Sequence, residues 1–510
     1  NKKISDHPII ITKRIENIDE GLHKRELAYY DRRQQRWHFI ATDNDIIASN
    51  RSIIKLARNG LNVISNTASL LVQYLNDFYC ENQDNILDME SVTQLGWRGN
   101  DFIYPNSDDK YSVDIEDGGE TIEIFGMKGD KKKYLNYYEK VVNASNYARF
   151  AVGASLAAPL VEPLHCRSMI AHLGGKSGGG KSALLNFACS PFGNPDYGVT
   201  SFNTTFVALE RRLVAMKNLP VFIDELQLAK NDKNWQYHLP KFPFFVADSV
   251  SKGRATIQGK EKAKHFRTIV LTSGEDFLTE YSSEMGAKQR VVELNAKEYL
   301  PKKLAKEINS EICKENYGLV GREWIEFIKK NKDIIKSNFK KLRDMLSEKF
   351  PNNSVDHINL VALSTIASTY FDLEFLHKNI LETEKKHFYC ACQILEELPK
   401  VNEMSDTERA KQVIEEAAEI HARNFTDKHG TFPSSDNNEF WGIKEDDFIA
   451  FVPTILRNVL TSNGFSARKI IKELLNEGYI VRDNQGNSAK NVNNKRMYYI
   501  PNNNVMAEAA

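Results

Sequence analysis

The feature that most constrains the possible fold of this chain is a glycine-rich segment between an apolar stretch and a helical one. Residues 168–173 have the length and composition of a buried strand, and residues 183–188 have those of a helix. Between them, Gly175–Ser182 matches the pattern G-x-x-x-x-G-K-[ST]. Average residue frequencies give this pattern by accident in roughly 2% of chains this long. The segment therefore predicts a doubly wound α/β domain with a phosphate-binding loop.

The residue types of this loop suit a nucleoside triphosphate with Mg²⁺. Glycines let the backbone curl so that successive N–H groups point at the phosphates, and the helix that follows adds its dipole. Lys181 is expected to reach the β- and γ-phosphates, and the Ser182 hydroxyl to ligate Mg²⁺. We therefore predict ATP and Mg²⁺ as cofactors. The predicted cofactor-binding residues are Gly175, Ser177, Gly178, Gly180, Lys181, Ser182 and Asp224.

A second apolar strand, residues 221–223, ends in the acidic pair Asp224 and Glu225. In an open α/β sheet the ligand binds at the carboxyl ends of the strands. Asp224 is expected to hold Mg²⁺ through water, so that Ser182 and Asp224 form the predicted metal site. Glu225 is expected to orient and polarise the attacking water, and simple P-loop kinases and switch GTPases generally lack this residue. The alternative is a strand that ends in solvated carboxylates.

Two further segments extend the predicted catalytic site. Residues 267–271 form a predicted strand that ends in Thr272 and Ser273, and either hydroxyl could sense the γ-phosphate. Arg290 lies just before the predicted strand 291–294. In an AAA+ core, an arginine at this place inserts into the neighbouring subunit's ATP site and stabilises charge on the γ-phosphate; a surface arginine is the alternative. The predicted catalytic residues are Glu225, Arg290, Ser273 and Thr272.

A basic segment separates the acidic pair from the next strand. From Lys241 to Arg267 there are seven Lys or Arg against two Asp or Glu. Small, basic and β-branched residues alternate around Gly259, as in a β-hairpin. In a ring-shaped motor a hairpin here projects into the pore, where Lys and Arg grip phosphates without regard to sequence. The predicted DNA contacts are Lys252, Arg254, Lys260, Lys262 and Lys264; a solvated charge run is the alternative.

The C-terminal residues predict a winged helix. Residues 451–461 form an amphipathic helix, and Ser466 caps a second helix over 467–476. Strands over 479–482 and 496–500, with an Asn-rich loop between them, complete the motif. The residues of the second helix predicted to contact duplex DNA are Arg468, Lys469 and Lys472. Winged helices also serve as protein-interaction modules, which is the alternative.

The other segments complete the predicted domain division. Short apolar runs at 7–12, 27–30, 37–41, 101–104 and 121–125 predict strands, with a helix near 67–79. An extra strand (198–202) and helix (205–216) follow the phosphate loop, a layout shared by AAA+, RecA-like and viral replicative helicases. The predicted domains are a mixed α+β domain (1–140), an AAA+ core (141–300), a helical lid region (301–423), a linker (424–442) and a winged helix (443–510).

Composition narrows the functional classes. The formal net charge is zero, which argues against a nucleic-acid coat protein and places any DNA contact on local basic clusters. No apolar run approaches the roughly 18 residues of a membrane span, and the first residues lack a secretory signal, so no membrane partner is expected. The six cysteines are scattered without a CxxC pair, which argues against disulfides and structural zinc. A cytoplasmic protein is expected.

Together these features resemble the MCM-like, self-loading AAA+ replicative helicases of staphylococcal mobile genetic elements, namely chromosomal cassettes and pathogenicity islands. MCM proteins proper carry an N-terminal zinc-binding element, and no set of cysteines here could form one. A sensor-2 arginine cannot be placed either; the predicted helix around His357 offers a histidine instead. The landmarks are Leu95-Gly96-Trp97 with Phe102-Ile103-Tyr104-Pro105, Gly175–Ser182, Asp224-Glu225, Lys252-Gly253-Arg254, Ser273-Gly274-Glu275, Gly286–Arg290 and the winged helix.

The resemblance implies a homohexameric ring that encircles DNA, unwinds it 3′ to 5′, loads itself and replicates a mobile element. Single-stranded DNA is expected in the pore, duplex DNA at the winged helix, and a primase or polymerase as a partner. Two other functions stay open. One is a replication initiator or ATP-controlled DNA-binding switch that does not unwind DNA. The basic hairpin favours the helicase over this alternative. The other is an AAA+ protein remodeller, which typically carries an aromatic pore-loop residue where this chain has lysines.

Overall fold

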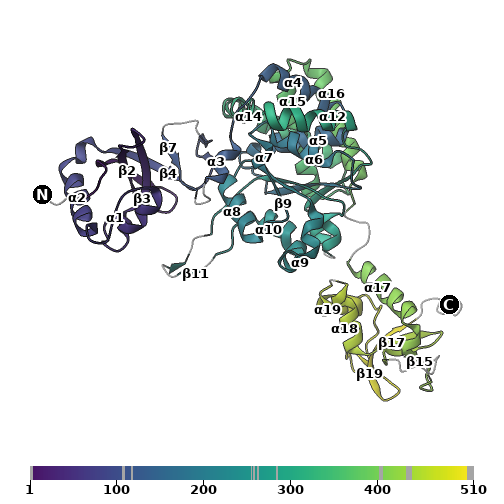
Figure 1. The fold of residues 1–510 in the computed structure, drawn as a ribbon. Helices are drawn as coiled ribbons and strands as arrows, with labels where there is room; N and C mark the ends of the chain where they lie inside the picture. The colour runs from purple at the N-terminus through teal and green to yellow at the C-terminus, as the bar shows by residue number, and fades with distance from the viewer. Residues whose placement is uncertain are drawn as a thin grey trace.

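The structure is a computed structural model that describes residues 4–105, 110–115, 119–253, 255–256, 259–260, 263–282, 285–400, 406–431, 439–463 and 465–501. Figure 1 shows an N-terminal part at the left, a larger central part, and a C-terminal part at the lower right. Within the described ranges, no helix is long and apolar enough to cross a membrane.

The central part is built on a five-stranded parallel sheet. Its strands are β8 (Met169–Gly174), β9 (Val199–Ser201), β10 (Val221–Asp224), β13 (Ile269–Ser273) and β14 (Val291–Asn295), in the order β14-β8-β13-β10-β9. Every residue of β8 is buried, as expected for a strand with both faces covered. The predicted α/β arrangement is therefore confirmed, and the carboxyl ends of all five strands meet at one edge of the sheet.

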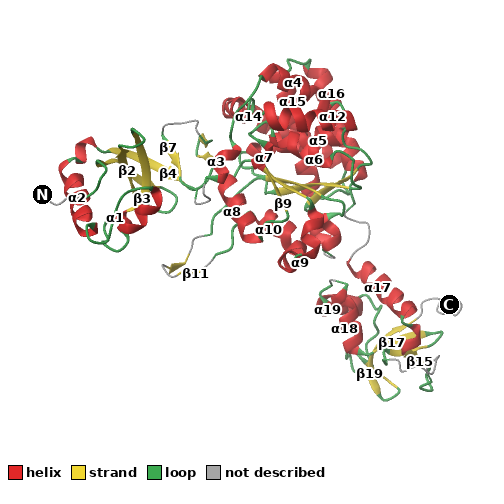
Figure 2. Ribbon diagram, viewed as in Figure 1, coloured by secondary structure: helices red, strands yellow, loops and turns green. Residues whose placement is uncertain are grey.

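Helices cover both faces of this sheet (Figure 2). On one side lie α5 (Asn146–Ala157) and α6 (Lys181–Cys189), backed by α4 (Lys131–Val142), α14 (Gly321–Lys349), α15 (Val355–Phe375) and α16 (Ile380–Glu397). The other side carries α8 (Phe206–Met216), α9 (Lys233–His238) and α10 (Phe242–Asp248). Gly153 lets α5 and α15 approach closely, because a Cβ there would collide with Ser364 and Ser368.

The N-terminal part contains a second five-stranded sheet. Its order is β3-β2-β1-β4-β7, with bounds β1 (Ile9–Asn17), β2 (Leu22–Asp31), β3 (Arg36–Asp43), β4 (Leu87–Val92) and β7 (Tyr111–Val113). Helix α2 (Ala68–Glu81) packs on one face through Leu71 and Leu75. The predicted strand over 121–125 is wrong: these residues belong mostly to helix α3 (Glu120–Ile124). Thr121 and Ile124, three residues apart, are its buried residues, so the apolar spacing was helical.

The C-terminal part begins earlier in the chain than the predicted domain division placed it. Helix α17 (Asp406–Ile420), which the division put in the helical region, shares a core with α18 (Pro453–Ser462) and α19 (Ala467–Asn476). Strand β15 (Phe425–Thr426) falls in the expected linker and pairs with β16 (Gly442–Lys444), with Phe425 buried. Residues 432–438 of that linker lie outside the described residues. The predicted helices 451–461 and 467–476 correspond to α18 and α19.

The wing of this part is formed by a different hairpin from the one predicted. Residues 479–482 form no strand, and Val481 makes only an isolated bridge to Tyr499. The partner of β19 (Lys495–Pro501) in the hairpin is β18 (Lys490–Val492), and β17 (Phe448–Phe451) lies on its other side. Asn493 and Asn494 form the turn with φ of 47° and 61°. Asparagine tolerates this left-handed region, which two-residue hairpin turns require, so the predicted loop is the hairpin turn.

Candidate nucleotide site and DNA-contacting elements

The glycine-rich loop between β8 and α6 has the curled backbone that phosphate binding requires. Gly175, Gly178 and Gly180 have φ of 115°, 85° and 84°, a region that other residues enter only at a cost. The loop is also held from outside, because Tyr299 N–H donates to the Gly179 carbonyl at 2.7 Å and the Tyr299 hydroxyl to the Gly174 carbonyl at 2.8 Å. The loop therefore keeps its shape through its own glycines and a buried tyrosine.

Lys181 begins α6 and points back into the loop. Its Nζ donates to the carbonyl oxygens of Gly175 and Lys176 at 2.6 and 2.9 Å. Burial lowers the pKa of the ammonium group, and the nearby carboxylates of Glu275 and Asp224 partly offset this effect. Ser182, the next residue, is exposed on the first turn of α6. A desolvated cation within a ring of backbone groups is suited to an anionic ligand of high charge.

The acidic pair stands at the end of β10. Asp224 Oδ1 accepts hydrogen bonds from the Glu225 backbone N–H at 2.8 Å and from the Ser273 hydroxyl. Glu225 is exposed and has φ 62° and ψ 57°, left-handed values that are uncommon for a residue other than glycine. Such backbone strain clusters at functional sites, where it directs a side chain.

The structure separates the two hydroxyls that the sequence left equivalent. Strands β10 and β13 are neighbours with Ile223 opposite Thr272, so Ser273 lies beside Asp224. Successive side chains of a strand point to opposite faces. Thr272 is accordingly turned away and fully buried, with its Oγ1 2.8 Å from His172 Nδ1. Of the pair, Ser273 belongs to the candidate site.

His172 is a residue of this region that the sequence reasoning missed. Its Nε2 lies 2.9 Å from the carbonyl of Asp276. Since a carbonyl only accepts, Nε2 carries the proton and Nδ1 accepts from the Thr272 hydroxyl. Burial lowers the pKa of His172 to about 4, so the ring is neutral near pH 7. It joins β8, β13 and the turn after β13; the signal in the sequence was a histidine in an otherwise apolar strand.

Arg290 is half-buried and packs within its own chain. Its Nη1 donates to the Gly286 carbonyl at 2.7 Å, and its guanidinium carbon lies 4.8 Å from the centre of the Phe244 ring. Among the residues that the structure describes, it forms no ion pair. The segment around it is fixed by the start of α15, where Ser354 Oγ donates to the Gln289 carbonyl at 2.8 Å and His357 Nε2 to the Lys288 carbonyl at 2.9 Å. His357 thus faces the Arg290 segment, and burial lowers its pKa.

The predicted hairpin is present as β11 (Ala255–Thr256) paired with β12 (Gly259–Lys260). Figure 1 shows it at the tip of an extended segment that leaves the central part. Arg254, Lys262 and the Lys260 side chain lie outside the described residues. Lys252 is exposed at the base, with its Nζ 4.7 Å from the centre of the Phe206 ring.

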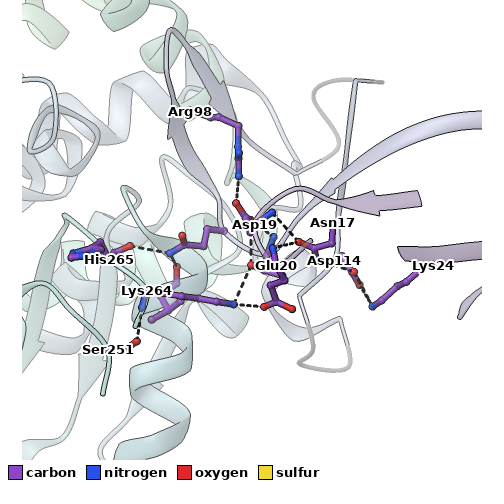
Figure 3. Close-up of polar contacts among 12 residues, drawn as sticks. Asn17, Asp19, Glu20, Lys24, Arg98, Asp114, Ser251, Lys264 and His265 are labelled. Carbon is purple, nitrogen blue, oxygen red and sulfur yellow. Dashed lines mark hydrogen bonds and ion pairs between the residues drawn. The ribbon is translucent and has the colours of Figure 1, made fainter. Parts of the chain in front are cut away.

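Lys264, at the other base of the hairpin, is engaged with the N-terminal part (Figure 3). Its Nζ pairs with the Glu20 carboxylate and donates to Thr93 Oγ1 at 3.2 Å. Gln94 Nε2 donates to the neighbouring His265 carbonyl at 2.9 Å. A cleft of about 820 Å³ lies along this junction, between the N-terminal sheet and α8. The structure therefore gives Lys264 a role in holding the base of the hairpin.

The predicted basic residues of the winged helix lie on one face of α19. Arg468, Lys469 and Lys472 are exposed, whereas Ile470, Ile471 and Leu474 are buried. Lys469 is 3.9 Å from Glu473 on the same helix, a surface pair of little energetic weight. The helix thus presents a cationic surface opposite its apolar one.

Comparisons with known proteins agree with this architecture. Residues 405–501 match the family model described as "Cch helix turn helix domain"; the match begins at α17, where the C-terminal core begins. A solved structure described as "SCCmec type IV Cch - active helicase" superposes with a TM-score of 0.68 at 18% identity, covering 97% of this chain and 93% of that one. The resemblance drawn from the sequence is confirmed by these two matches, and at this identity the superposition establishes a shared fold.

Other comparisons add less. A structure described as "The A form apo structure of NrS-1 C terminal region-CTR" has a TM-score of 0.30 at 13% identity, over 77% of this chain and 89% of that one. No curated protein matches the chain. Residues 1–265 match the family model described as "Domain of unknown function (DUF927)", and this range includes both the glycine-rich loop and the acidic pair. Because that match spans more than half of the 510 residues, the chain belongs to the DUF927 family.

Proposed function

We propose that this protein is an ATP-hydrolysing DNA helicase with an AAA+ core. The observation that carries the proposal is the meeting of three motifs at the carboxyl edge of adjacent parallel strands: the loop Gly175–Ser182, the pair Asp224–Glu225 and Ser273. The strand order β14-β8-β13-β10-β9 puts an additional strand, β9, beyond the acidic strand. This layout supports a helicase-type ATPase over a simple P-loop kinase.

The residues divide the chemistry of ATP hydrolysis among them. Lys181, together with the loop N–H groups of Gly178 and Gly180, binds the phosphates. Ser182 and Asp224 supply the hydroxyl and carboxylate oxygens that suit Mg²⁺, which when bound offsets phosphate charge. Glu225 orients the attacking water, and Ser273, bonded to Asp224, responds to the γ-phosphate. Arg290 acts on the ATP of a neighbouring subunit in a homohexamer.

The DNA-binding elements support the helicase over other ATPase functions. The hairpin β11–β12 would grip single-stranded DNA in the pore, with Lys252, Arg254, Lys260 and Lys262 binding phosphates. Arg468, Lys469 and Lys472 would contact duplex DNA from the winged helix, which we place from about residue 405 onward. The fold shared with a structure described as an active helicase of SCCmec adds support. Unwinding from 3′ to 5′, self-loading and replication of a mobile element are further parts of the proposal.

Strand displacement on a forked DNA substrate tests the proposal. Glu225→Gln should bind ATP but hardly turn over, because only water activation is removed, and removing one transition-state interaction of this kind typically lowers kcat about 10²- to 10³-fold. Lys181→Ala should lose ATP binding itself. Glu374→Gln, an exposed carboxylate at the end of α15, is the matched control and should behave as wild type. ATP hydrolysis with DNA binding but no displacement by the wild type would favour the initiator instead.

A further inference from the structure

The N-terminal sheet has an open face opposite α2, which lies on the outer side of the sheet (Figure 1). Strand alternation and the pairing of β2 with β3 put Trp37, Phe39 and Tyr30 on this open face. Trp37 is 44% and Phe39 62% exposed. Leu87 of β4, on the same face, is 65% exposed. A solvent-facing sheet surface is normally polar, so these exposed apolar side chains mark an interaction surface.

The aromatic rings of this face form an ordered group. Trp37 and Phe39 are two residues apart on β3, which separates their side chains by about 7 Å. Tyr30 lies opposite Trp37 on β2, with the ring centres 5.5 Å apart. Ala28, opposite Phe39 on the same face, is buried. We name Tyr30, Trp37 and Phe39 the aromatic platform; Trp37, packed against Tyr30, and Phe39 stand far enough apart for each to contact a separate flat group.

The turn next to the platform is cationic. Arg32 and Arg33 lie between β2 and β3, Arg36 begins β3, and all three are exposed. Within the described part of the chain, none of them forms an ion pair. The one carboxylate of the turn, Asp31, accepts the backbone N–H groups of Arg33 and Gln34, and these bonds lower its pKa. The turn from Asp31 to Arg36 therefore carries three positive charges against one negative.

We infer that the aromatic platform and its arginine turn bind single-stranded DNA, as a contact site separate from the pore hairpin. Exposed rings beside arginines that form no ion pair among the described residues match the two parts of a single strand, namely base faces and phosphates. Duplex DNA fits less well, because its bases are already stacked. The choice of DNA rests on the proposed function, but the binding site does not need ATP hydrolysis or unwinding to operate.

Tryptophan fluorescence of the full chain with oligo(dT), without nucleotide, tests this inference. The other tryptophans 97, 235 and 324 are buried, and Trp441 is partly buried, so a change on binding reports mainly Trp37. Oligo(dT) should quench the wild type. Trp37→Phe should still bind while losing most of the quenching. Trp37→Ala with Phe39→Ala should weaken binding about thirtyfold or more, since two rings are removed and stacking is worth about 1 kcal/mol or more per base.

The charge of the turn has its own readout. Replacing Arg32, Arg33 and Arg36 with Gln should reduce the salt dependence of oligo(dT) binding by roughly 0.7 in log–log slope for each phosphate that is no longer neutralised. A matched control, Arg58→Gln, which changes an exposed arginine outside the turn, should bind as wild type. Because all these side chains are exposed, the variants should fold, and circular dichroism verifies this.

Two results would overturn the inference. One is unchanged affinity and quenching in the Trp37 and Phe39 variants. The other is unchanged DNA binding with an altered oligomer mass, which would make this edge of the sheet an interface between copies of the chain. Failure of the helicase proposal is distinguishable: a chain that shows Trp37-dependent quenching but never unwinds DNA keeps this site, whereas a chain that unwinds without Trp37 dependence loses it.

Discussion

Acidification tests the buried histidine that joins β8 to β13. Burial lowers the pKa of His172 to about 4, whereas an exposed histidine titrates near about 6.5. Between these values the unfolded chain binds a proton that the folded chain does not. The contribution of His172 to stability is therefore complete above about pH 6.5 and falls as the pH falls toward about 4. Integration between about pH 7 and about pH 5 gives a loss of about 2 kcal/mol.

His172→Asn removes this titration. The ring touches the Thr272 hydroxyl and the Asp276 carbonyl, and the charge of Lys181 adds a smaller lowering of its pKa. The variant should be less stable than wild type near pH 7, by about 1–3 kcal/mol for polar groups left without a partner. It should then lose about 2 kcal/mol less than wild type on acidification.

Hydrogen exchange of the β8 and β13 amides measures this locally, since exchange reports the opening free energy of each segment. Rates at about pH 7 and about pH 5 are compared after correction for intrinsic exchange. His429→Asn, an exposed histidine in the C-terminal part, is the control and should keep the wild-type pH dependence. An equal loss of protection in wild type and His172→Asn would refute the reasoning.

Three further outcomes are expected. Arg290→Ala should keep ATP affinity and lose hydrolysis, and mixing it with Lys181→Ala should restore part of the ATPase rate; no rescue in mixtures shown to co-assemble contradicts a role between subunits. Glu20→Gln and Lys264→Ala should impair unwinding alike and leave unchanged the log–log slope of single-strand affinity against salt concentration. A slope lowered by roughly 0.7 in Lys264→Ala alone would mean that Lys264 binds a phosphate. Removal of residues 443–510 should expose Ala410, Ile414 and Ala418 of α17 and cause aggregation, measured by light scattering. Truncation before residue 405 should instead leave soluble protein that still unwinds a pre-formed fork.

The central sheet was predictable because its signals are local. The loop Gly175–Ser182 needs glycine at fixed places, and each strand that follows is a short apolar run with a polar end. The helices α18 and α19 were predictable for the same reason, since the apolar spacing and the flanking residues of each helix lie within a single short stretch of sequence. The strand predicted over 121–125 failed because five residues are too few to separate period 2 from a single helical turn.

Contacts between segments that are distant in the chain could not be predicted from the sequence. The pairing of Lys264 with Glu20 joins residues 244 positions apart, and no local pattern marks it, so Lys264 was indistinguishable from the other lysines of the hairpin. The choice between Thr272 and Ser273 likewise needed the register of β13 against β10, which fixes the face that each hydroxyl takes. The role of α17 depended on which of two cores its apolar side covers.

The packing of Arg290 bears on how it could serve a neighbouring subunit. Its Nε is buried and has no partner among the described residues, a state that costs about 1–3 kcal/mol. Leaving its present position would forfeit one hydrogen bond to Gly286, worth about 0.5–1.5 kcal/mol, and the packing on Phe244, worth about 0.5–1 kcal/mol at an exposed site. A phosphate that accepts from both Nε and Nη would recover the buried donor and add charge-assisted bonds. The resting position is thus weak enough to permit the proposed movement of Arg290 toward the ATP of a neighbouring subunit, while Ser354 and His357 keep its segment in place.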